Sequence, residues 1–167
     1  MPVGLVEQKP RQSRKSRAPT SLRARALGML ARREYSRLEL ERKLAGHAEN
    51  PGEIPELLTD FERRGWLSEQ RVVDQQIASR RRRFGAQRIV HELRAKGITE
   101  ELIDAAVVAL KETELDAART VWRIKFGTAP LDAAARARQV RFLQGRGFAL
   151  TTALEVIAGN KQNDDAS

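Results

Sequence analysis

The sequence predicts an all-α protein that contains a repeated helical unit, and three observations lead to this fold class. Residues that favour helices, chiefly Ala, Leu, Arg, Glu and Gln, are abundant, whereas aromatic residues make up only 5% of the chain. Apolar residues recur at the spacing of a helix face through most of the sequence. A pattern of helix, turn and helix also returns after about 50 residues, which indicates internal duplication.

The first twenty residues, "MPVGLVEQKPRQSRKSRAPT", are predicted to be a disordered basic arm. They hold three prolines, several basic residues and little that could be buried. An organelle transit peptide is the alternative, but Pro10 and Pro19 would interrupt the amphipathic helix that such a peptide needs. Residues 161–167 are expected to form a disordered C-terminal tail.

The first helix is predicted to begin at Ser21 and the second at Ser36. Ser36 lies three residues before Glu39, which is the spacing of a capping box. Tyr35 and Leu40 are placed to form a hydrophobic staple across that cap. The first helix has an apolar face made of Leu22, Ala26, Leu27 and Leu30.

The third helix is predicted to carry Pro55 in its first turn and to stop near Gly65. The loop "GHAENPG" separates it from the second helix, which ends at about Ala45. Its inward-facing residues are Ile54, Leu57, Leu58 and Phe61.

The internal repeat is clearest between "HELRAKGITEELIDAAV" and "RFLQGRGFALTTALEVI". A shift of 50 residues superposes apolar positions and two glycines: Leu93 on Leu143, Gly97 on Gly147, Ile98 on Phe148, Ile103 on Ala153, Ala106 on Val156 and Val107 on Ile157. A glycine at these places is typical of a helix that ends in the left-handed conformation. Thr99 is then the expected N-cap of the next helix, and acidic residues follow it in the first turn.

The charge of the chain points to acidic partners. The net charge is +9 and the isoelectric point is near 10.7, which favours polyanions or acidic protein surfaces. Basic and acidic blocks alternate, with about +6 over residues 71–96 and about −5 over residues 97–116.

Residues suited to metal, cofactor or redox chemistry are scarce. The chain has no cysteine, which excludes disulfides and thiolate metal sites and is compatible with the cytoplasm. His47 and His91 have no second ligand at metal-binding spacing, and no glycine-rich phosphate loop occurs. No apolar run approaches the length of a membrane span. We therefore expect no metal, no cofactor and no membrane partner.

Four segments in order resemble the RecX family of regulatory proteins, which modulate the RecA recombinase. They are "ALGMLARREYSRLELERKL" (26–44), "LLTDFERRGWLSEQRVV" (57–73), "RFGAQRIVHELRAKGI" (83–98) and "RFLQGRGF" (141–148). The ordered set is more specific than any one of its pieces, and it extends over roughly residues 22–158.

The resemblance implies an elongated protein of three tandem three-helix repeats, expected at residues 21–68, 69–112 and 113–160. It implies a cytoplasmic regulator that is not an enzyme. The expected partner is the RecA filament on DNA, with restraint of its ATP hydrolysis, strand exchange and coprotease activity in recombination, DNA repair and the SOS response. A monomer is expected.

The run "RRRRFG" is the predicted partner-binding surface, because four successive arginines point in different directions around a helix end. Capping of a helix C-terminus explains only one or two of them. Phe84 is interpreted as a core anchor rather than a base-stacking platform. The candidate residues are Arg80, Arg81, Arg82, Arg83, Arg88 and Lys96.

Two alternative functions stay open. The segment "ELRAKGITEELIDAAV" has the outline of a DNA-binding helix-turn-helix, and weak direct contact with DNA is a related possibility. Its second helix is acidic, with Lys111 as the only cation, whereas a recognition helix should be basic. A helical scaffold without nucleic acid would also be compatible with the repeat.

Overall fold

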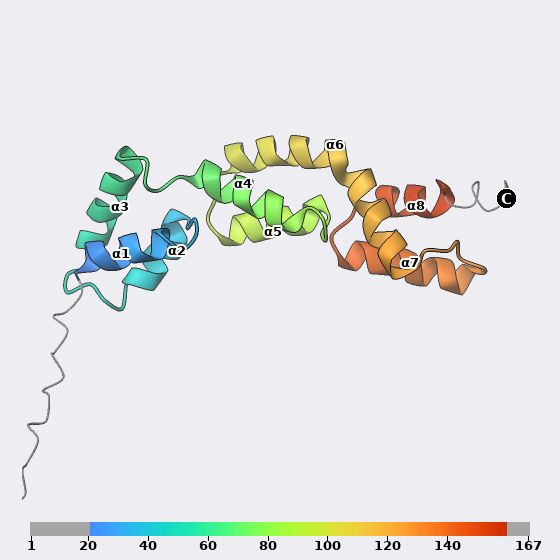
Figure 1. Cartoon of the computed structure of the whole chain (residues 1–167), viewed down its shortest axis with the longest axis horizontal. Coiled ribbons are helices and arrows are strands. Elements are labelled where there is room, and N and C mark those ends of the chain that lie inside the picture. The colour runs from blue at the N-terminus through green and yellow to red at the C-terminus, as the bar shows by residue number, and fades with distance from the viewer. Residues whose placement is uncertain (1–20, 160–167) are drawn as a thin grey trace, which may run out of the picture.

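The computed structural model describes residues 21–159, and this range contains eight helices and no strand. The helices follow one another along an extended row (Figure 1), which confirms the all-α, elongated prediction. The predicted basic arm and C-terminal tail lie outside the described residues. The helices are α1 (Leu22–Leu30), α2 (Arg37–Leu44), α3 (Glu53–Arg63), α4 (Glu69–Arg80), α5 (Ala86–Ala95), α6 (Glu100–Lys125), α7 (Ala133–Gly145) and α8 (Leu150–Gly159).

Three separate hydrophobic cores divide the row into three-helix units, as the resemblance implied. The first unit consists of α1, α2 and α3 around the fully buried Leu40, Leu58 and Phe61. The second unit consists of α4, α5 and the N-terminal half of α6. The third consists of the C-terminal half of α6 with α7 and α8, and Trp122 and Phe148 lie in its core.

The second and third units share a helix. α6 runs without a break over 26 residues and passes through the expected boundary between residues 112 and 113. Its Ile103 belongs to the core of the second unit, and its Val121 belongs to that of the third. No proline or glycine occurs between Glu100 and Lys125, so nothing in the sequence ends the helix there.

Most of the predicted caps are confirmed. The Ser36 hydroxyl accepts a hydrogen bond from the Glu39 N–H, and the Glu39 carboxylate accepts one from the Ser36 N–H, so the capping box is complete. Thr99 is the N-cap of α6 but its side chain makes no capping bond. Instead, the Thr99 N–H donates to the carboxylate of Glu69, at the start of α4, over 3.3 Å.

The two repeat glycines adopt the predicted left-handed conformation, with φ of 73° at Gly97 and 85° at Gly147. Each also has a second role. A Cβ on Gly97 would come within 2.8 Å of the Leu38 side chain in α2, and a Cβ on Gly147 would come within 2.6 Å of the Arg88 main-chain nitrogen. The N-terminus of α2 therefore packs on the α5–α6 turn, and the N-terminus of α5 packs on the α7–α8 turn.

The two tryptophans differ in environment. Trp122 is buried in the third core, and its indole N–H donates to Gln139 over 2.8 Å. Trp66 packs edge-on against Phe61 but remains 40% exposed. Its outer side is approached by the guanidinium groups of Arg23 and Arg64.

Candidate partner-binding surface

The loop that follows α4 is held against the third unit by main-chain contacts. The Gly85 N–H donates to the Arg146 carbonyl over 2.9 Å, and the Gln87 N–H donates to the Gly147 carbonyl over 3.2 Å. Gly85 is buried, and a Cβ there would overlap the main chain of Gly147. The two backbones can approach this closely only because glycine occupies both positions, and the approach brings arginines of two units together.

Two of the candidate arginines are already paired. Arg80 and Arg88 both contact the carboxylate of Glu92, at 3.1 and 3.3 Å respectively. Their guanidinium carbons also lie 5.4 and 4.4 Å from the centroid of the Phe84 ring. Phe84 itself packs against the second core, in agreement with its interpretation as an anchor. Arg80 and Arg88 thus help to hold the loop as well as adding positive charge.

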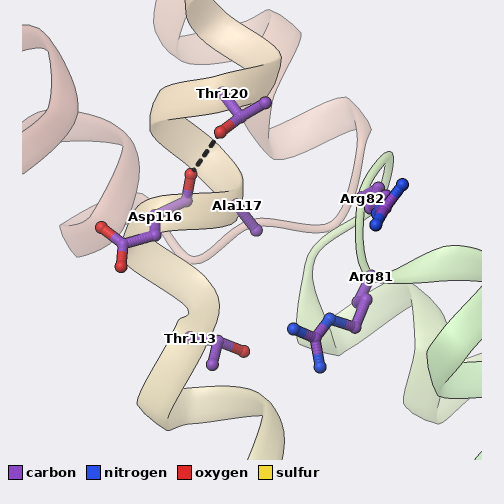
Figure 2. A pocket seen from close by; sticks show the side chains of 6 residues that line it. All are labelled: Arg81, Arg82, Thr113, Asp116, Ala117 and Thr120. Atoms are coloured by element: carbon purple, nitrogen blue, oxygen red, sulfur yellow. Dashed lines mark hydrogen bonds between the residues drawn. The ribbon is translucent and has the colours of Figure 1, made fainter.

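The three arginines that lie between Arg80 and Arg88 in the sequence have no carboxylate partner. Arg81, Arg82 and Arg83 are exposed, and no carboxylate within residues 21–159 forms an ion pair with them. Arg81 and Arg82 line a cavity of about 240 Å³ whose opposite wall is the middle of α6. Figure 2 shows the Arg81 guanidinium extending toward the Thr113 side of that helix. Unpaired cations at the surface keep their full charge available to a partner.

Arg83 lies on the other side of the loop, beside the third unit. It lines an open hollow of about 600 Å³. The other lining residues are Phe84, Arg88, Arg141, Phe142, Gly145 and Arg146. Arg146 donates to the main-chain carbonyl of Arg83 over 3.3 Å. The prediction from the sequence missed Arg141 and Arg146. Their signal was available, because α7 and its C-cap, residues 133–146, contain four arginines and no acidic residue.

Lys96 is not part of this arginine cluster. It follows the C-terminus of α5, and the ten residues of that helix place it about 15 Å from the Gly85 end. Its ammonium group contacts Glu39 of the first unit over 2.7 Å, and both side chains are largely buried. Burial acts to raise the pKa of Glu39, but hydrogen bonds from Lys96, the Ser36 N–H and Arg33 outweigh it and lower that pKa. Lys96 therefore contributes to the junction between the first and second units.

Other classes of site find little support in the described part of the chain. Residues 21–159 contain no group of three His, Cys, Asp or Glu side chains placed to hold a metal ion. Within the same range, none of the helices is both long enough and apolar enough to span a bilayer. The arginine-rich junction of the second and third units remains the candidate partner-binding surface.

Comparison with known proteins agrees with the architecture. Residues 68–107 match the family description "RecX, second three-helix domain", and residues 112–157 match "RecX, third three-helix domain". The crystal structure of RecX from Lactobacillus salivarius superposes with a TM-score of 0.72 at 15% identity, and it covers 84% of this chain and 95% of that one. This similarity supports the fold.

Relatives identified by sequence share more identical residues with this chain than that crystal structure does. The regulatory protein RecX of Leptothrix cholodnii is 47% identical over 142 residues, which cover 85% of this chain and 90% of the relative. RecX of Ralstonia pickettii is 42% identical over 143 residues, which cover 86% of this chain and 90% of the relative. These matches extend through all three units. The chain therefore belongs to the RecX family of regulatory proteins.

Proposed function

We propose that this protein is a non-enzymatic regulator that binds the RecA filament on DNA and restrains its ATP hydrolysis, strand exchange and coprotease activity. Membership of the RecX family supports a regulatory role. The elongated row of three units supports an extended target, because each unit presents its own surface along the row. We further propose that it acts in the cytoplasm as a monomer.

The observation that carries the proposal is the unpaired charge at the junction of the second and third units. Arg81, Arg82, Arg83 and Arg141 are all exposed and have no ion-pair partner within the described range. A recombinase filament filled with DNA offers acidic side chains and phosphates to such a surface. Association through this surface should weaken as salt rises.

The charges of α6 argue against the helix-turn-helix alternative. Its first turn carries Glu100 and Glu101, and Glu100 is paired with Arg94 over 2.9 Å. The opposite side of this half of the helix is buried in the second core through Ile103 and Ala106. A helix that exposes acidic residues is repelled by DNA phosphates, so α6 is unsuited to lie in a groove.

The test is the DNA-dependent ATPase of RecA, measured with increasing amounts of this protein. We expect RecA turnover to fall, while the protein alone hydrolyses no ATP. Free RecA and bare DNA serve as comparisons in a pull-down, which separates filament binding from direct DNA contact. Unchanged RecA turnover and unchanged filament disassembly at saturating protein would overturn the proposal.

A further inference from the structure

The hollow between the second and third units is lined by cations and aromatic rings alone, apart from Gly145. Its four arginines come from two units: Arg83 and Arg88 from the second, and Arg141 and Arg146 from the third. No acidic side chain lines it. Arg88 is paired with Glu92, but the other three have no ion pair within residues 21–159. Like charges around one hollow repel one another, so an anion placed there relieves that repulsion as well as forming new contacts.

Two of these arginines are held in place before any ligand arrives. The Arg146 guanidinium lies 4.9 Å from the Phe142 ring centroid and 5.8 Å from that of Phe84, and it also donates to the Arg83 carbonyl. Arg88 lies 4.4 Å from the Phe84 centroid and contacts Glu92. Side chains fixed in this way lose less entropy on binding than free ones.

The other two arginines are free to bind. Arg83 and Arg141 are exposed, and their side chains have no ion pair or hydrogen bond to any residue between 21 and 159. The N–H donors of each guanidinium lie in one plane, and two of them can bind both oxygens of a carboxylate. The hollow thus combines a preformed cationic wall with two adaptable donors.

The aromatic rings favour a protein ligand over single-stranded nucleic acid. A base needs an uncovered ring on which to stack. Phe84 is already approached by three guanidinium groups, and Phe142 is contacted by Arg146 and packs edge-on against Phe126 at 5.2 Å. The rings therefore orient the arginines, and a ligand in the hollow contacts the guanidinium groups and not the ring faces.

We propose that this hollow binds the carboxylate side chains of an acidic peptide segment on the protein partner. The inference rests on the proposed function, since it assigns one part of the regulator's contact with its target to Arg83, Arg88, Arg141 and Arg146. Neighbouring Glu or Asp side chains can share the four guanidinium groups through paired N–H to oxygen bonds.

The experiment uses the full chain and no RecA, so its failure is distinct from failure of the regulator proposal. A fluorescein-labelled oligoglutamate peptide is titrated with the protein at about 0.15 M salt, with fluorescence anisotropy as the readout. An oligothymidylate of the same charge is titrated in parallel. The test variant is Arg83→Gln with Arg141→Gln, and the matched control is Arg42→Gln with Lys43→Gln on the exposed side of α2, which removes the same charge.

We expect the test variant to bind the peptide about tenfold more weakly than the parent, and the control to change by less than about twofold. Melting temperatures of both variants should match the parent, and Arg141→Gln alone should show a smaller loss in the same direction. Equal losses in the two double variants would mean non-specific charge attraction and would overturn the proposal. Tighter, pocket-dependent binding of the oligothymidylate would overturn it in favour of nucleic acid.

Discussion

The hydroxyl of Ser36 donates a hydrogen bond to the main-chain carbonyl of Lys96 over 2.5 Å, although the two residues are 60 positions apart. The same hydroxyl accepts the capping bond from the Glu39 N–H. The Lys96 ammonium in turn donates a hydrogen bond to the Glu39 carboxylate. Ser36 is fully buried at this point. One serine therefore caps α2 and fastens the first unit to the second.

Ser36→Ala should lower the free energy of unfolding by about 2 to 3 kcal/mol. The substitution removes an N-cap, worth about 1 kcal/mol, and leaves the Lys96 carbonyl without its partner. Urea unfolding measures the loss. Ser68→Ala is the matched control, because Ser68 caps α4 through one bond of 3.4 Å to the Arg71 N–H. Equal losses in the two variants would show that the bond to Lys96 contributes nothing.

Gly85→Ala should destabilise the protein by more than about 2 kcal/mol through overpacking. The φ of Gly85 is −76°, which alanine adopts without strain, so the cost comes from the overlap of the new Cβ with the Gly147 main chain. Gly28→Ala, within α1, is the control, since its Cβ would meet nothing within 4 Å. That change should stabilise the protein by about 0.5 to 1 kcal/mol. Thermal unfolding of both variants measures the difference, and a neutral Gly85→Ala would contradict the close approach.

Stability should fall with acidity in a way that depends on Glu39. Its pKa is lowered in the folded protein, so its contribution is present above the ordinary value of 4.5 and disappears as the pH falls through the lowered pKa. Glu39→Gln should therefore flatten the stability curve below about pH 4.5. Unfolding measured across the acid range tests this, and an unaltered curve would rule out the role of Glu39.

Asp60 provides a contrast in the same experiment. Hydrogen bonds from Arg23 and Arg64, and a weaker one from Arg63, lower the pKa of Asp60 to about 2. The stability that Asp60 contributes is therefore complete above its ordinary pKa of 3.8 and is lost as the pH falls to about 2, whereas the loss due to Glu39 begins near 4.5. Asp60→Asn should remove the pH dependence between about pH 3.8 and pH 2.

Replacing Arg81, Arg82 and Arg83 together with Gln should weaken filament binding but leave stability within about 0.5 kcal/mol of the parent. Arg80 is kept, because it pairs with Glu92. If Arg81 and Arg82 each meet a phosphate, the slope of log affinity against log salt should become shallower by about 0.7 to 0.9 for each of these two arginines. A salt series with RecA filaments, with thermal melts alongside, provides the measurement.

The matched control for that triple change comes from the first unit. Arg32, Arg42 and Lys43 are exposed and have no ion-pair partner among the residues described, so their replacement by Gln removes the same charge elsewhere. If this control weakened binding as much as the junction variant, net charge alone would explain the effect.

Local features of the fold were accessible from the sequence, because short-range physics determines them. The Ser36 capping box follows from a spacing of three residues, and the left-handed turns at Gly97 and Gly147 follow from the apolar pattern around each glycine. The continuity of α6 could also have been read, since no helix-breaking residue interrupts it.

Contacts between units could not be read in this way. Nothing near Gly85 in the sequence indicates that it meets Gly147, because the contact depends on how two units pack. For the same reason, Lys96 and the arginines looked like one basic segment, although α5 separates them and Lys96 pairs with Glu39. Arg141 and Arg146 join the candidate site only through the packing of α7 beside the loop.

The length of α6 has a mechanical consequence. At 26 residues it follows a path of about 39 Å, and it changes direction about half-way along without losing helical continuity (Figure 1). The second and third units are therefore joined by continuous helix, and their relative orientation follows from the bend in the middle of α6. The first unit is joined to the second by residues 64–68, which lie between α3 and α4, and by the contacts that Ser36 and Glu39 make with Lys96. Torsion applied by a partner along the row would thus be carried by a helix backbone at one junction, and by a short connection with a few side-chain contacts at the other.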